Sequence, residues 1–217
     1  EAQRPEMVVN GMRAVDVSLT TRELARMIRD ARIDFARLPD EECFDELVAQ
    51  STGAAPIFGA TGGVMEAALR TAADVLEKRS VENVEYHEVR GLAGIKEATF
   101  TLGGKELKVA VASSTGAAKE LIQRIKAGDA SYAFVEVMAC PGGCVNGGGQ
   151  PIVSAYKRMD LDPREKRAAG LYAEDESKVI RKSHENPDIK KLYEEFLGKP
   201  NSHLAHRLLH TEYTDRS

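Results

Sequence analysis

The sequence is poor in cysteine, has no long apolar run and has no basic stretch, and each of these absences excludes a class of protein. Three cysteines in 217 residues are too few for a disulfide framework and fit a reducing compartment, where thiols serve metals or redox chemistry. No stretch approaches the roughly 18 uninterrupted apolar residues that span a bilayer, so we expect a soluble protein without membrane insertion. The net charge of −4 and the pI of about 5.8 argue against a nucleic-acid partner.

The beginning of the chain suggests that it continues a longer polypeptide. Residues 1–6 read EAQRPE, with neither an initiating methionine nor a signal peptide. With 42% hydrophobic residues, 217 residues can bury one sizeable core.

Two cysteines lie four residues apart in a glycine-rich run between Met138 and Pro151. Cys140 and Cys144 supply soft thiolates, and the glycines let the backbone approach a ligand closely. The pattern therefore predicts a loop built around an iron–sulfur cluster. A glycine turn with incidental thiols, or half of a zinc site, is the alternative. A cubane cluster normally takes four thiolates, so the chain cannot complete one alone, and we expect Cys43 to be an ordinary thiol.

A second glycine motif, Gly59–Gly63, opens directly into an alanine-rich segment. A glycine loop that begins a helix presents N–H groups and the positive end of the helix dipole, which suits an anionic ligand. A tight packing turn is the alternative. The motif matches neither a Walker loop nor a dinucleotide fingerprint. The apolar face of the helix that follows is predicted to hold Leu69, Ala72, Val75 and Leu76.

Periodicity predicts an α/β fold: a mixed sheet with a parallel strand-helix-strand unit, flanked by helices and followed by a helical C-terminal tail. A capping box at Thr20 and Glu23 begins an early helix. The predicted strands are 84–89, 98–102, 105–112 and 132–137, with a Gly103-Gly104 turn between the second and third and a helix at 116–126 before the fourth. Later helices are predicted at 164–173 and 188–197, each with proline at its first position. The parallel unit places the cysteine loop at the carboxyl end of a strand, where open α/β sheets bind ligands.

Five further residues could be mistaken for functional groups. His203, His206 and His210 recur at helical spacing, and we expect surface or packing roles for them. His184 precedes a helix start and is expected to be structural. The strand pattern around Glu136 does not settle whether that carboxyl group is buried.

The segment from Glu136 to Pro151 resembles the third signature loop of the [FeFe]-hydrogenases, the iron-only hydrogenases. Residues 58–68 are similar to a glycine motif of that family, and residues 181–186 with 208–211 are similar to its C-terminal tail. Residues 1–6 are similar to the stretch that follows the family's second signature loop. The resemblance therefore implies that residues 1–151 form the α/β half of the catalytic domain with both glycine motifs. Residues 152–217 would be a helical tail that wraps the same domain.

The resemblance also implies a cofactor and a role for particular residues. In the family, a [4Fe–4S] cubane is joined through a cysteine sulfur to a two-iron subcluster that carries CO, cyanide and a bridging dithiolate. Cys140 would ligate the cubane, and Cys144 would ligate it and bridge to the two-iron unit. Cys144 and Met138 are thus the expected catalytic residues. The residues expected to contact the cofactor are Phe58, Gly59, Ala60, Thr61, Gly62, Val64 and Met138.

The implied activity is the reversible conversion of protons and electrons to dihydrogen by an oxidoreductase that is incomplete without the upstream half. Further iron–sulfur clusters would lie in that half. The expected partners are that half, on the same or a separate chain, and a redox partner such as ferredoxin or an NADH-linked subunit. We expect a cytoplasmic location, with a periplasmic one left open. The alternatives are a non-catalytic iron–sulfur assembly or scaffold relative and a hydrogen sensor.

Overall fold

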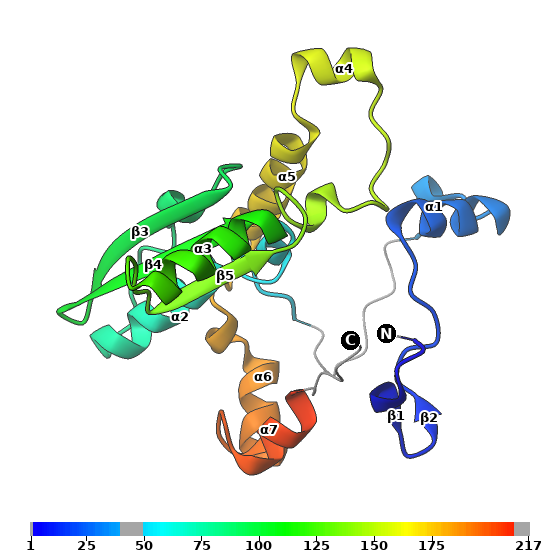
Figure 1. The fold of residues 1–217 in the computed structure, drawn as a ribbon. Helices are drawn as coiled ribbons and strands as arrows, with labels where there is room; N and C mark the ends of the chain where they lie inside the picture. Colours follow the sequence, from blue (N-terminus) through cyan, green and yellow to red (C-terminus); the bar gives the residue numbers. More distant parts are fainter. Residues whose placement is uncertain (1, 40–49, 211–217) are drawn as a thin grey trace. The chain divides into compact units, whose positions relative to one another are not determined.

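A computed structural model describes residues 2–39 and 50–210 of the chain (Figure 1). The described residues fall into two compact units that are discontinuous in sequence. The larger unit contains Gln50–Gly148 and Ile152–Asn186, and the smaller contains the described parts of Glu1–Ala49, Gly149–Pro151 and Pro187–Ser217. The predicted division of the domain at residue 151 stays a prediction. Cys43 lies outside the described residues.

The larger unit is built on a three-stranded mixed sheet with the order β3-β4-β5. The strands are β3 (Ile95–Leu102), β4 (Lys105–Ser113) and β5 (Phe134–Met138). Gly103 and Gly104 both have positive φ and connect antiparallel β3 and β4, as a tight hairpin turn requires. Helix α3 (Thr115–Ala127) connects β4 to β5, which are parallel. The predicted hairpin and the parallel strand-helix-strand unit are therefore confirmed.

Helices cover both faces of this sheet. Val109 and Val111 of β4 pack with Met65 and Leu69 of α2 (Gly63–Glu77). The alternate residues of β4, Ala110 and Ala112, pack on the other face with Ala118 and Leu121 of α3. The near-continuous apolar run of β4 follows from this burial on two faces. Of the predicted apolar face of α2, Leu69 is buried, but Val75 is 67% exposed.

The predicted strand at residues 84–89 is wrong. This segment is irregular and ends in a short 3-10 helix, η4 (His87–Val89). The Tyr86 ring packs edge-on against Phe100 at 5.3 Å, and the Val84 carbonyl accepts a hydrogen bond from Arg70 Nε at 2.8 Å. Because the Arg70 side chain of α2 donates to the Val84 carbonyl, that backbone group is satisfied without a neighbouring strand.

The other regular elements of the larger unit are helical. They are η3 (Pro56–Gly59), η5 (Cys144–Asn146), α4 (Ala155–Asp160), α5 (Pro163–Ser177) and η6 (Ser183–Glu185). The Asp162 side chain accepts a hydrogen bond from the Arg164 amide and caps α5, so the helix predicted from Asp162-Pro163 is confirmed at its start.

The smaller unit has short elements. They are η1 (Pro5–Met7), β1 (Val8–Val9), β2 (Met12–Arg13), α1 (Thr21–Asp30), η2 (Phe35–Arg37), α6 (Pro187–Leu192), the π-helix η7 (Tyr193–Leu197) and α7 (His203–Leu209). The capping box of Thr20 and Glu23 is confirmed at the start of α1. Among the described residues, no helix is both long and apolar enough to cross a membrane.

Candidate iron–sulfur site

The cysteine loop begins two residues after β5, at the carboxyl end of the parallel strand pair. Cys140 is half-buried and Cys144 is exposed, and neither is in a disulfide bond. Gly142 and Gly143 both have positive φ, which gives the loop its sharp turn between the two thiols. Helix α5 supports the far side of the loop, where Arg167 Nη1 donates a hydrogen bond to the Val145 carbonyl at 2.8 Å. The loop is thus a fixed backbone that presents two cysteines at the edge of the sheet.

The two glycine motifs, far apart in sequence, lie against each other. The Thr61 amide donates to the Gly142 carbonyl at 3.1 Å. A Cβ added at Gly143 would lie 2.7 Å from the Gly59 carbonyl oxygen, so only glycine permits this approach. Ser113, the last residue of β4, connects the loops: its hydroxyl accepts from the Gly142 amide at 2.8 Å and lies 3.1 Å from the Thr61 hydroxyl. The sequence had not drawn attention to Ser113, which ends an apolar strand.

The N-terminus of α2 is occupied by a carboxylate from the chain itself. Glu136, which is buried, accepts hydrogen bonds from the Gly62 amide at 2.6 Å and the Met65 amide at 2.7 Å. The expectation that these amides await an anionic ligand is therefore wrong, because Glu136 already satisfies the helix end. Close packing explains the glycines: a Cβ at Gly62 or Gly63 would meet backbone oxygens at 2.0 and 1.7 Å. The packing-turn alternative thus describes this motif.

Lys96 of β3 approaches the same loop from the sheet. Its Nζ donates to the Gly91 carbonyl at 2.7 Å and to the Thr61 carbonyl at 3.3 Å. Burial lowers the pKa of Lys96 to about 8, and the nearby Glu136 charge partly opposes that shift.

Phe58 and Val64 flank the glycine motif and line an open apolar groove along α2. The groove, of about 600 Å³, is lined by Phe58, Val64, Ala67, Ala68, Thr71, Ala72, Val75, Leu76 and Ser183. Its lining does not include Met138, Cys140 or Cys144. Met138 ends β5, half-buried, as the register partner of Ser113. The structure therefore brings the glycine and cysteine loops together but does not place Met138 in the groove of Phe58 and Val64.

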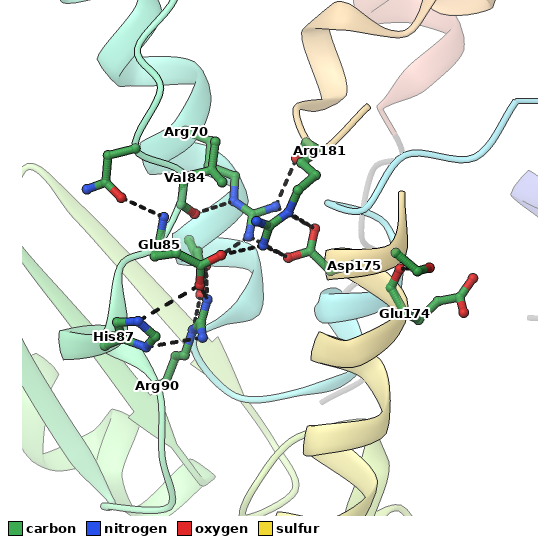
Figure 2. A network of polar contacts seen from close by, with 11 residues as sticks. Arg70, Val84, Glu85, His87, Arg90, Glu174, Asp175 and Arg181 are labelled. Atoms are coloured by element: carbon green, nitrogen blue, oxygen red, sulfur yellow. Dashed lines mark hydrogen bonds and ion pairs between the residues drawn. The ribbon is translucent and has the colours of Figure 1, made fainter. Parts of the chain in front are cut away.

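A buried network of charged side chains joins α2 to α5 (Figure 2). Its members are Glu66, Arg70, Glu85, Arg90, Asp175 and Arg181. Arg70 and Asp175 are fully buried and pair through both guanidinium nitrogens, at 2.8 and 2.7 Å. Burial alone would raise the pKa of Asp175, but hydrogen bonds from Arg70 and Arg181 hold it below its ordinary value. Glu66 and Arg70 stand four residues apart in a largely apolar helix, a spacing that was not singled out from the sequence.

His184 has the structural role predicted for it. Its Nε2 lies 2.9 Å from Asp74 Oδ2, and its Nδ1 lies 3.0 Å from the Thr71 hydroxyl. Asp74, His184 and Glu185 could in principle hold a metal ion, but the Lys182 ammonium already contacts both Asp74 oxygens at 2.8 Å.

The three C-terminal histidines do not form a metal site in the described part of the chain. His206 and His210 stack with their ring centroids 4.5 Å apart, and no group of His, Cys, Asp or Glu ligands there includes them.

The donor set of the cysteine loop fits part of an iron–sulfur site. Two thiols that are not in a disulfide project from one rigid loop, and thiolates are the ligands that such clusters take. Among the described residues there is no third cysteine, so the remaining thiolates of a cubane would come from elsewhere.

An α/β core that presents two cluster-type cysteines from a glycine loop defines an iron–sulfur class of protein, and comparison with known proteins gives the family. Residues 1–148 match the family model of the iron only hydrogenase large subunit, C-terminal domain, and residues 161–216 match that of the iron hydrogenase small subunit. The chain therefore belongs to the iron-only hydrogenase family.

Individual relatives agree with this assignment. The chain is 52% identical to NADP-reducing hydrogenase subunit HndD of Solidesulfovibrio fructosivorans, covering 100% of the chain and 36% of the relative. It is 48% identical to Iron hydrogenase 1 of Clostridium pasteurianum, covering 98% and 37%. The solved structure of [FeFe]-hydrogenase HydA1 from Chlamydomonas reinhardtii matches with a TM-score of 0.75 and 39% identity, over 98% of this chain and 59% of that one.

Two further findings bear on function: how much of its relatives' length the chain covers, and its similarity to a protein that is not named a hydrogenase. The chain spans 36–37% of the length of these two curated hydrogenases. It is also similar to Protein NAR1 of Arabidopsis thaliana, at 32% identity over 92% of the chain and 42% of that relative. Activity therefore has to be argued from the site.

Proposed function

We propose that this chain forms the C-terminal half of the catalytic domain of an iron-only hydrogenase, which interconverts dihydrogen with protons and electrons. The observation that carries the proposal is the contact between the cysteine loop and the glycine loop at the sheet edge, in a chain of this family. Thr61, Gly142 and Ser113 hold the two loops together, and this contact supports a cofactor site shared by the cysteine loop and the glycine loop.

In this proposal Cys140 and Cys144 would hold a [4Fe–4S] cluster, and Cys144 would also hold a two-iron subcluster. The remaining thiolates come from the upstream half of the domain, on the same or a separate chain. The bound cofactor supplies the redox chemistry of hydrogen. Cys144 and Met138 are the proposed catalytic residues, because both stand where the strand pair and the cysteine loop would face the two-iron unit.

The other proposed contacts use the apolar character of the glycine loop. Phe58 and Val64 would exclude water from the cofactor, and the Met138 thioether would add a soft contact. The backbone of Gly59, Ala60, Thr61 and Gly62 would pass close to the cofactor. The Gly62 amide would not donate to the cofactor, because it already donates to Glu136 at 2.6 Å. Water exclusion and close packing would thus be the contribution of this loop.

The proposed electron partner is ferredoxin or a nicotinamide-linked subunit, in a cytoplasmic assembly. The similarity to a subunit named for NADP reduction supports the second of these partners.

The experiment is reconstitution of the chain, together with the upstream half of the domain, with iron, sulfide and a matured two-iron unit. Cys144→Ser is expected to abolish hydrogen turnover and reduce bound iron, with thermal stability little changed. Cys43→Ser is the matched thiol control and is expected to keep both activity and iron. Full activity in Cys144→Ser would contradict the proposed ligand.

A non-catalytic assembly role is the second candidate, favoured by the 33% identity to Cytosolic iron-sulfur assembly component 3 of Rattus norvegicus. An assembly relative would take up the cubane but not the two-iron unit. Infrared spectra of the matured protein separate the two candidates, since CO and cyanide stretching bands arise only from the two-iron unit. Bands without sustained turnover would indicate a hydrogen sensor.

A further inference from the structure

One row of side chains crosses the sheet on the face that α2 covers. Lys96 of β3 is the register partner of Val111 of β4, and Val111 is the register partner of Glu136 of β5. Register partners project to the same face of a sheet. A cation and an anion therefore stand on either side of a buried valine, beneath the N-terminus of α2.

Both charges reach the same peptide group. Glu136 Oε1 accepts from the Gly62 N–H at 2.6 Å, and Lys96 Nζ donates to the Thr61 carbonyl oxygen at 3.3 Å. These atoms are the two ends of the Thr61–Gly62 peptide bond. Each charge also has a second backbone contact, Glu136 with the Met65 amide and Lys96 with the Gly91 carbonyl.

The peptide needs such support because its conformation is unusual. Gly62 has a φ of +95°, and a Cβ there would lie 2.0 Å from the Val89 carbonyl oxygen. Burying a charge is unfavourable unless it is paired or hydrogen-bonded, so a buried carboxylate and a half-buried ammonium directed at one peptide form a specific arrangement.

We propose that Lys96 and Glu136 are positioning residues that clamp the Thr61–Gly62 peptide and so hold the Phe58–Val64 loop in the shape that the cofactor pocket requires. Neither side chain touches the cofactor in this proposal. The effect of the clamp on the cofactor rests on the proposed function. The clamp itself is a property of the chain alone.

The clamp is tested by amide hydrogen exchange, followed by NMR on the chain without cofactor. Glu136→Gln and Lys96→Met are compared with Glu106→Gln and Lys105→Met, which change the same residue types at exposed positions of β4. We expect exchange at Gly62 to be at least tenfold faster in both clamp variants and unchanged in both controls. Unchanged exchange in the clamp variants would overturn the proposal. Lys96→Met keeps an apolar stem and carries the test if Glu136→Gln does not fold.

The double variant tests whether the two residues act on one peptide. Because either change alone would release that peptide, the fold increase in exchange for Glu136→Gln with Lys96→Met should be smaller than the product of the single increases. An increase equal to the product would mean two independent supports and would contradict a shared clamp.

The link to the cofactor is tested in the matured protein assembled with its upstream half. We expect Lys96→Met to broaden the CO and cyanide infrared bands at least twofold at unchanged iron content, because the loop around the cofactor becomes heterogeneous. Bands as sharp as in the parent protein would refute the positioning role. If the parent protein takes up no iron, the proposed function fails, while the exchange measurement still decides the clamp.

Discussion

Replacing Asp175 by alanine removes the acid at the centre of the buried network. Its side chain is fully buried and accepts hydrogen bonds from Arg70 at 2.8 and 2.7 Å and from Arg181 at 3.3 and 2.5 Å. Arg70 is itself fully buried on α2, so the ion pair joins α2 to α5 in the interior. The change would leave two guanidinium groups without the acid that they share.

The size of the effect follows from what each arginine retains. Removing one partner of a buried ion pair typically costs about 3–5 kcal/mol, because the other charge stays buried without compensation. Arg181 is 21% exposed and keeps Glu85, while Arg70 keeps Glu66, so we expect the lower end of that range. With an m value of about 2 kcal/mol/M in urea, a loss of about 3 kcal/mol lowers the unfolding midpoint by about 1.5 M.

The assay is urea unfolding at pH 7, followed by circular dichroism. Glu174→Ala is the matched control on the same helix: its carboxylate points away from the network in Figure 2 and pairs only with Lys178 among the ion pairs of the described residues. A surface pair of this kind contributes about 0–1 kcal/mol. If Asp175→Ala loses no more stability than Glu174→Ala, the network does not hold α5 to the core.

Two further predictions concern acid and the cysteine loop. The folded-state pKa values of Asp175 and Glu85 are lowered, so their stabilising contribution is present above the unfolded value of about 4 and is lost as the pH falls through the folded values. Melting temperatures measured from pH 6 to pH 2 should therefore fall less steeply in Asp175→Asn than in the parent protein. An equally steep fall would contradict the contribution assigned to Asp175. Gly143→Ala should lower the free energy of unfolding by about 1–3 kcal/mol in urea titrations, because φ is +96° and the added Cβ would meet Gly59. Gly148→Ala should cost less than half as much, because a Cβ added there would meet nothing within 4 Å.

The sheet was predictable because its signals are local. Gly103-Gly104 between alternating runs predicts the hairpin, and the helix between β4 and β5 makes those strands parallel. Residues 84–89 looked like a strand for the same local reason. Their conformation is decided by residues outside the segment. Arg70, 14 residues earlier than Val84, donates a hydrogen bond to the Val84 carbonyl, and Phe100 packs against the Tyr86 ring. Periodicity carries no information about such partners.

The site was predictable only as two separate motifs. Residue types alone indicate a soft metal at Cys140 and Cys144, whereas the glycines at Gly59–Gly63 suggested an anion-binding loop, with a packing turn only as the alternative. The contacts that join the motifs were not predicted, because Ser113 and Glu136 act on residues 29 and 74 positions away in sequence. The register of β5 on β4 turns Glu136 toward α2, and no single strand's pattern contains that register.

The position of Glu136 changes what the glycine loop can contribute to cofactor binding. A helix N-terminus with its amides available would attract an anionic cofactor by itself. Here the chain's own carboxylate takes the Gly62 and Met65 amides, so any further anion at that end would face a buried negative charge. In the proposed function, attraction would then come from the thiolates, because bonds from sulfur to iron do not depend on a helix dipole, and the apolar side chains of the loop would keep water out. On this reasoning, loss of either cysteine should reduce cofactor uptake, while changes in the glycine loop should alter the properties of a cofactor that still binds.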